Sequence, residues 1–122
     1  MRLAMVHQEV AKETGADIQV AVQAIDLAKI SQELDIPVLA QHIDPVVFGS
    51  HTGHILPESV QMAGAAGTLL NHSERRLERE VLKASIQRAK EVGLKTIVCA
   101  QDRARLVLSF KHCAFLFRLS PP

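Results

Sequence analysis

The chain has 122 residues, of which 48% are apolar and 22% are charged, and its formal net charge is +1. This composition is typical of one folded soluble domain and excludes a disordered or strongly charged protein. No apolar run approaches the roughly 20 residues of a membrane-spanning helix, and the first ten residues lack the pattern of a secretion signal. We therefore expect a cytoplasmic protein. Its two cysteines, Cys99 and Cys113, predict no disulfide framework and no zinc site, but buried or incidental thiols.

Helical and strand patterns alternate along the first 100 residues. Apolar residues at helical spacing, followed by Gly15, predict a first helix that ends near residue 15. Capping and first-turn residues mark where the later helices start, and short β-rich runs mark the strands. The later helices are expected to begin at Asp26, Pro57 and Ser73, the strands to cover residues 18–22, 37–41, 67–70 and 95–99, and residues 44–53 to form a loop.

The strands are continuously apolar rather than alternating, and a helix separates each pair of them. Both features favour parallel strands joined by helical crossovers, because such strands are buried on both faces. The sequence therefore predicts an α/β fold with about four parallel strands. The pattern alone leaves open whether the sheet is flat or rolled into a barrel.

A change in composition near residue 102 divides the chain into two predicted parts. Residues 1–102 carry 10 basic and all 13 acidic side chains, whereas residues 103–122 carry four basic and no acidic ones. Three of the four phenylalanines also lie in this second part. A basic segment of this kind could contact nucleic acid or a membrane surface, but its charges lack regular amphipathic spacing. We predict a divergent basic tail over 103–122 and expect neither partner.

The segment from Asn71 to Arg76 holds the most informative residues, because it follows the third expected strand directly. In parallel α/β folds, functional side chains gather at the carboxyl ends of the strands. If a helix begins at Ser73, the positive end of its dipole disfavours a charged imidazole at His72. A neutral ring can donate its N–H to a substrate carbonyl. The alternative is that Ser73 is only a helix cap and His72 an ordinary loop residue.

Several segments together resemble one known family. The sequence His-Ser-Glu-Arg-Arg at residues 72–76 resembles the signature of the triosephosphate isomerase family, and 67–70 resembles the fourth strand of that family's barrel. Residues 40–45 and 49–58 are similar to the third strand and the loop after it. Asn71 in place of glycine, with the sequence at 41–44, resembles the shorter archaeal branch. The resemblance covers residues 1–100 and implies a partial (βα) TIM-barrel with strands 2 to 5.

The resemblance also implies an activity and roles for single residues. The family interconverts dihydroxyacetone phosphate and glyceraldehyde 3-phosphate in glycolysis and gluconeogenesis, by proton transfer through an enediolate and without a cofactor. His72 would be the electrophile that polarises the carbonyl of the triose phosphate substrate, and Glu74 the supporting acid beside it. A neutral catalytic histidine is an established feature of this family rather than a deduction from this sequence. Thr52 would lie on a loop that reaches into a neighbouring subunit, so a homo-oligomer is expected.

Several parts of the family's machinery have no counterpart in the 122 residues. The family places a lysine after its first strand, a base glutamate after its sixth, and glycine-rich phosphate loops after its seventh and eighth. Here no Glu follows Glu91 and the last glycine is Gly93. We therefore expect a truncated chain that is inactive or weakly active alone. The alternatives are a non-catalytic half-barrel that serves as an oligomerising or binding module, and a second chain that supplies the missing half.

Three further histidines, His42, His51 and His54, raise the question of a metal site. His51 and His54 are three residues apart, but no cysteine or carboxylate partner is assigned to their loop. We expect these histidines to have structural or surface roles and the protein to bind no metal.

Overall fold

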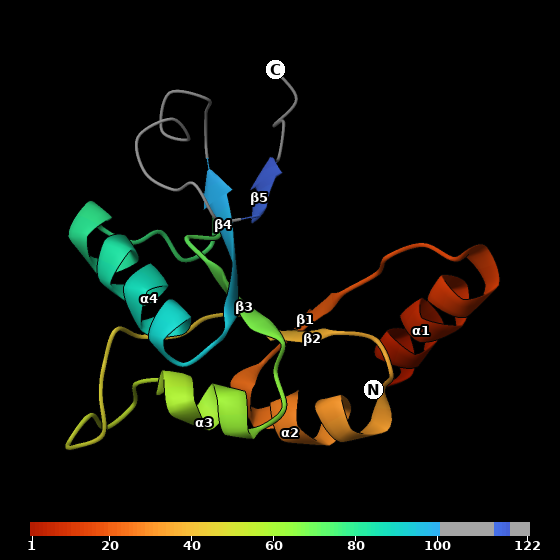
Figure 1. The fold of residues 1–122 in the computed structure, drawn as a ribbon, viewed down its shortest axis with the longest axis horizontal. Helices are drawn as coiled ribbons and strands as arrows, with labels where there is room; N and C mark the ends of the chain where they lie inside the picture. Colours follow the sequence, from red (N-terminus) through yellow and green to blue (C-terminus); the bar gives the residue numbers. More distant parts are fainter. Residues whose placement is uncertain (101–113, 118–122) are drawn as a thin grey trace.

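The computed structural model describes residues 1–100 and, by its backbone, residues 114–117. Within them, five parallel strands form one sheet in chain order, and helices connect the first four (Figure 1). The strands are β1 (Val20–Val22), β2 (Val38–Ala40), β3 (Gly67–Leu70), β4 (Lys95–Ala100) and β5 (Ala114–Phe117). The helices are α1 (Arg2–Thr14), α2 (Ala24–Glu33), α3 (Pro57–Met62) and α4 (Arg79–Glu91).

The predicted α/β class and parallel pairing are confirmed. Residue pairs such as Val20 with Val38, Leu39 with Gly67 and Leu70 with Val98 set the register. Because each strand runs in the same direction, all of the strands end at the same edge of the sheet. Helices α2, α3 and α4 lie along one side of the curved sheet in Figure 1. This arrangement matches part of a barrel with its outer helices.

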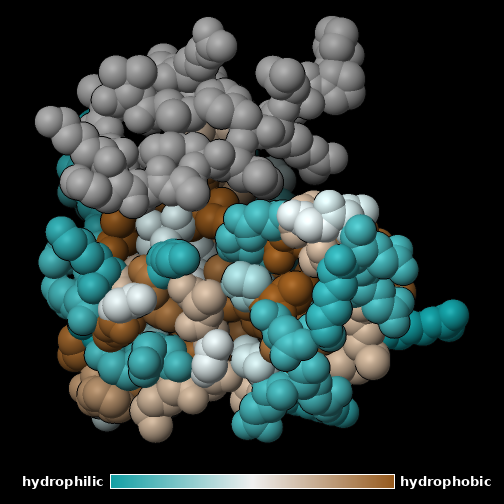
Figure 2. Space-filling view, turned by 45° about the vertical axis from the view of Figure 1, so that its right-hand side comes forward, coloured by the Kyte–Doolittle hydropathy of each residue, from teal (hydrophilic) through white to brown (hydrophobic). Residues whose placement is uncertain are grey.

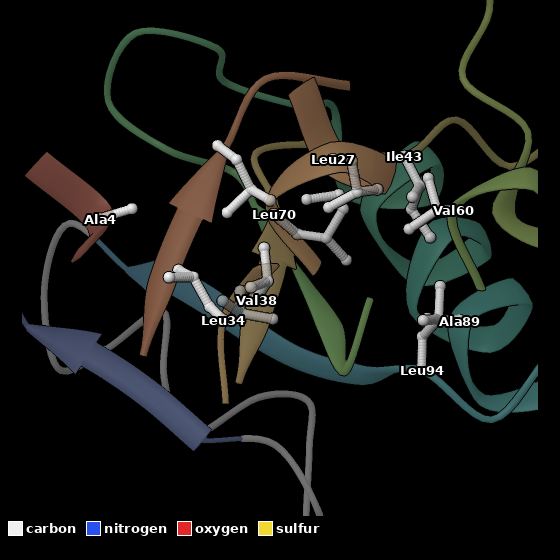
Figure 3. Packing of buried hydrophobic residues seen from close by; sticks show 12 residues of the cluster. Ala4, Leu27, Leu34, Val38, Ile43, Val60, Leu70, Ala89 and Leu94 are labelled. Carbon is white, nitrogen blue, oxygen red and sulfur yellow. The ribbon is translucent and has the colours of Figure 1, made fainter. Parts of the chain in front are cut away.

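The core lies between the sheet and these helices (Figure 3). Leu27 and Ile30 of α2 are buried against strand residues, and Leu70 is fully buried. Ala89 of α4 is also fully buried, because a small side chain lets the helix approach the sheet closely. The members of this cluster with less than a tenth of their surface exposed are Ala4, Leu27, Ile30, Leu34, Val38, Ala40, Ile43, Val60, Leu70, Ala89, Leu94 and Val98.

The segment between β2 and α3 is a loop, as predicted. Its two ends are held together, since the backbone N–H of Asp44 donates to the Ile55 carbonyl at 2.9 Å. Arg88 of α4 fixes the same segment from the side: its Nε donates to the Val46 carbonyl at 3.1 Å, and its guanidinium pairs with Glu58 of α3. The loop is therefore anchored to two helices at its base.

Two predicted helix starts differ from the structure. Helix α2 begins at Ala24 rather than at Asp26, which lies in its first turn instead of capping it. Helix α4 begins at Arg79, so residues 71–78 form an irregular turn and Ser73 caps no helix. In this turn the side chains bond to distant parts of the backbone, and such contacts override a local capping pattern.

Strand β5 comes from the segment that was predicted to be a divergent tail. It pairs with β4, with Val98 opposite Phe115. The rest of that predicted tail lies outside the described residues, as does Cys113. Cys99 is buried, as expected for an incidental thiol.

Helix α1 confirms the first predicted helix and ends at Gly15, whose φ of 70° lets its N–H reach the Ala11 carbonyl. Only Ala4 of this helix is buried. The apolar face that predicts the helix is open to solvent: Leu3 is 71% exposed, Val6 46% and Val10 40%. Figure 2 shows a face of the molecule on which hydrophobic residues reach the surface among hydrophilic ones. None of the described helices is both long and apolar enough to span a bilayer.

Candidate active site

A pocket of about 510 Å³ lies at the carboxyl ends of the first three strands. Two glutamines contribute to its lining: Gln23 follows β1 directly, and Gln41 follows β2 at the matching position. The turn after β3 forms another wall. The residues that line the pocket are Ala21, Gln23, Ala24, Gln41, His42, Ile55, Leu69, His72, Glu74 and Arg75.

His72 and Glu74, the two predicted catalytic residues, both line this pocket and lie close to each other. The side chain of His72 is 37% exposed, and that of Glu74 is 88% exposed. Nδ1 of the His72 ring lies 3.4 Å from the backbone N–H of Glu74 and 3.3 Å from the Glu74 carboxylate. These two contacts demand opposite proton placements, since the N–H needs an acceptor and the carboxylate needs a donor.

The helix-dipole argument for His72 is not supported, because helix α4 begins seven residues further on. The turn fixes the His72 backbone, since the N–H of Arg75 donates to the His72 carbonyl at 2.8 Å. When Nδ1 accepts from the Glu74 N–H, the proton of a neutral ring is on Nε2.

Asn71 fixes the start of the turn. Its φ of 60° is in the left-handed region, which asparagine tolerates better than most residues. Its Nδ2 donates to the Cys99 carbonyl and its Oδ1 accepts from the Leu77 N–H, both at 2.9 Å. Arg76 donates to the Asn71 carbonyl at 2.9 Å. These bonds join the ends of β3 and β4 and direct the chain toward the pocket.

Asp44 is 13% exposed and contacts two lining residues of the pocket, His42 and Arg75. It accepts from the Ile55 N–H at 2.7 Å, from His42 Nε2 at 3.1 Å and from Arg75 at 3.4 Å. Burial raises the pKa of the Asp44 carboxyl, but the hydrogen bonds from Ile55 and His42 outweigh it and leave the pKa below its usual value. Burial lowers the pKa of His42, and the hydrogen bond to Asp44 only partly opposes this. The pair is held as a carboxylate beside a neutral imidazole.

The other predicted residues lie outside the pocket or at its wall. Thr52 is exposed on the loop between β2 and α3. It does not line the pocket, whereas Ile55 on the same loop does. His51 and His54 are exposed on the same loop with ring centroids 6.0 Å apart, whereas His42 is buried against Asp44. Among the described residues, no group of three or more His, Cys, Asp or Glu side chains is placed to hold a metal ion.

Sequence reasoning missed the two glutamines and the roles of Asp44 and Arg75. The glutamines could have been found, because each is the first polar residue after a parallel strand and such positions share one edge of the sheet. Asp44 and Arg75 are 31 residues apart, and no local pattern signals their contact.

Comparison with known proteins decides the family. The family model of triosephosphate isomerase matches residues 2–112. This chain belongs to the triosephosphate isomerase family. A curated triosephosphate isomerase of Methanobacterium bryantii is 51% identical over 102 residues, which are 84% of this chain and 45% of the relative. That of Saccharolobus solfataricus is 46% identical over 103 residues, with the same coverage of both chains.

The family and the partial barrel predicted from the sequence are thereby confirmed. A solved structure, triosephosphate isomerase from Bartonella henselae, superposes with a TM-score of 0.71 at 22% identity and shows the same fold. The superposed region covers 84% of this chain and 46% of the Bartonella henselae chain. The chain thus spans about half the length of the triosephosphate isomerases it matches.

Proposed function

We propose that the chain carries the electrophilic half of a triosephosphate isomerase site, with dihydroxyacetone phosphate and glyceraldehyde 3-phosphate as its substrates. The observation that supports this best is His72 at the wall of a pocket at the carboxyl ends of parallel strands. Nε2–H of His72 donates to the substrate carbonyl oxygen as that oxygen gains negative charge in the enediolate. Glu74 lies beside the ring as the supporting acid.

The 122 residues alone are proposed to be inactive or weakly active. Isomerisation needs a base that removes a proton from one carbon and returns it to the next. Glu74 is the one carboxylate among the described lining residues, and it lies on the Nδ1 side of His72 rather than across the pocket. Arg75 is the one described lining cation, which offers a weak grip on a phosphate in water. No cofactor enters this chemistry.

The remaining roles complete the proposal. Residues 1–102 form the isomerase-like part and 103–122 a divergent basic tail. Thr52 contacts a second subunit, since it is exposed on a loop whose base is anchored, and the protein is a homo-oligomer of the archaeal type. It acts in the cytoplasm, in glycolysis and gluconeogenesis.

The half-barrel that only oligomerises is the alternative, favoured by the exposed apolar residues of α1.

Ligand binding tests the role of His72 without requiring turnover. We expect dihydroxyacetone phosphate to shift the imidazole signals of His72 saturably in an NMR titration, because the ring lines the pocket. His51 is exposed outside the pocket and serves as the internal control. Shifts of equal size at His51, or equal shifts with inorganic phosphate alone, would contradict a carbonyl contact at His72.

Turnover tests the second part of the proposal. An isomerase assay of the 122-residue chain and of His72→Ala is expected to give rates within about tenfold of each other, because without a base that removes the substrate proton the contribution of His72 to proton transfer is not realised. A folded His72→Ala variant, checked by circular dichroism, is required for the comparison. A rate that falls more than about 100-fold on this substitution would show a complete site and overturn the proposed inactivity.

A further inference from the structure

Asp44 contacts both segments that flank the candidate site. On one side it closes the loop of residues 44–55: its backbone N–H donates to the Ile55 carbonyl at 2.9 Å, and its Oδ2 accepts from the Ile55 N–H at 2.7 Å. These two bonds form a reciprocal pair at the base of the loop. Ile55 itself lines the pocket.

The other carboxylate oxygen of Asp44 faces His42, two residues earlier in the same segment, and the turn after β3. Oδ1 accepts from His42 Nε2 at 3.1 Å and from Arg75 Nη2 at 3.4 Å. The backbone N–H of Arg75 donates in turn to the His72 carbonyl at 2.8 Å. Asp44 is thus joined to Ile55 on one side and, through the side chain and backbone of Arg75, to the backbone of His72 on the other.

A carboxylate is well suited to this position. It has two acceptor oxygens, and Asp44 uses one for the loop and the other for the turn. Its side chain is only 13% exposed, so the bonds it accepts from Ile55 and His42 are less weakened by water than those at the surface, whereas Arg75 on the other side is 57% exposed. An asparagine has one acceptor oxygen and one donor, so it could serve the loop or the turn but not both.

We propose that Asp44 is a positioning residue that couples the 44–55 loop to the turn that carries His72. A change at the loop then reaches the turn through the ion pair of Asp44 with Arg75. The inference rests on the proposed function in taking His72 as the group that contacts substrate. The coupling itself is a property of the folded chain and can be measured without substrate.

Residue-resolved amide hydrogen exchange tests the coupling. Asp44→Ala is expected to speed exchange about tenfold at the N–H groups of Ile55 and of Arg75, because it removes the acceptor oxygens of both segments. Asp35→Ala is the matched control, since Asp35 is an 80% exposed aspartate paired with Lys12 away from the pocket. It removes the same charge and is expected to leave both amides unchanged.

A second variant separates coupling from simple loop anchoring. Arg75→Gln breaks the link to Asp44 and leaves the bond between Ile55 and Asp44 in place. It is expected to speed exchange at the amide of position 75, corrected for the intrinsic rate of glutamine, and not at Ile55. In the double variant, the protection lost at position 75 is expected to equal that of Asp44→Ala alone, because both changes remove one shared interaction.

Two results would overturn the inference. One is an Asp44→Ala variant in which Ile55 exchanges faster while Arg75 does not, since Asp44 then anchors only its own loop. The other is a double variant whose effects at position 75 are the product of the two single effects, which means that the residues act independently. Arg75→Gln alters a side chain that is 57% exposed and keeps the test valid if Asp44→Ala does not fold. A chain without isomerase activity can still show this coupling, so a failure of the proposed function is distinguishable from a failure of this inference.

Discussion

Asn71 combines an unusual backbone angle with two hydrogen bonds, and these contributions can be separated. Asn71→Ala loses both bonds and places a Cβ in the left-handed region, so we expect it to lower the free energy of unfolding by about 2–4 kcal/mol. Asn71→Gly loses the same bonds but tolerates the φ of 60°. It is expected to be about 1 kcal/mol more stable than Asn71→Ala. Urea unfolding of the two variants checks the order, and equal stabilities would mean that the backbone angle costs nothing.

His42 and Asp44 make stability depend on pH. Both have a lowered pKa in the folded state, so the unfolded chain binds more protons and stability falls as the pH falls. For His42 the loss begins as the pH drops through about 6.5, its ordinary value, and for Asp44 only below about 3.9. Arg75 is the other charge that faces His42, and it disfavours the imidazolium further.

Replacing His42 isolates its part of this dependence. His42→Gln is expected to flatten the change in unfolding free energy between pH 7.5 and 5.5, because the neutral amide gains no proton on unfolding. His54→Gln, at an exposed position on the neighbouring loop, is the control. Urea unfolding at each pH gives the slopes, and identical slopes for wild type and His42→Gln would refute the assignment.

At the scale of elements, β3 and β4 approach each other at Gly67. A Cβ on Gly67 would overlap the Lys95 carbonyl oxygen, which belongs to the backbone of the paired strand and can yield only if the two strands move apart. We expect Gly67→Ala to cost about 1–3 kcal/mol of stability by separating the strands. Gly15→Ala is the comparison, since a Cβ there meets nothing within 4 Å and costs only its left-handed angle. Thermal unfolding should rank Gly67→Ala below Gly15→Ala.

Elements with local signals could be predicted from the sequence, and elements held by distant contacts could not. Gly15 and Pro57 mark helix boundaries through their own backbone preferences, and both boundaries are found as predicted. The start of α4 was misplaced at Ser73 because a hydroxyl before a glutamate resembles a cap. The turn is instead set by bonds from Asn71 to Cys99 and Leu77.

The same distinction between local signals and distant contacts applies to the candidate site. Its place at the carboxyl edge of the sheet follows from parallel strands, and His72 and Glu74 were predicted there because they occupy the turn after β3. The ring's environment was not predictable, since Nδ1 lies beside the backbone N–H and the carboxylate of Glu74 and no helix begins there. The link through Asp44 joins residues 31 positions apart and is visible only in three dimensions.

For the whole molecule, the open face of α1 and the sheet edges predict self-association. Leu3 and Val6 are more than 45% exposed on one helix, and exposed apolar surface of this kind drives association in water. At the sheet edge, β1 leaves one side of its backbone unpaired within the described residues, which can template pairing with another chain. We expect light scattering of the 122-residue chain to report a mass that rises with concentration.

Polar substitution on α1 tests which surface is responsible. The double variant Leu3→Lys and Val6→Lys is expected to reduce the weight-average mass toward that of a monomer, because charged side chains oppose burial of this face. Ile25→Lys, at a position that is 87% exposed on α2, adds charge elsewhere and is the control. If both variants associate as the wild type does, the apolar face of α1 is not the contact and the unpaired edge of β1 is the next surface to block. If the wild type is monomeric at every concentration, exposed apolar surface does not drive association of this chain.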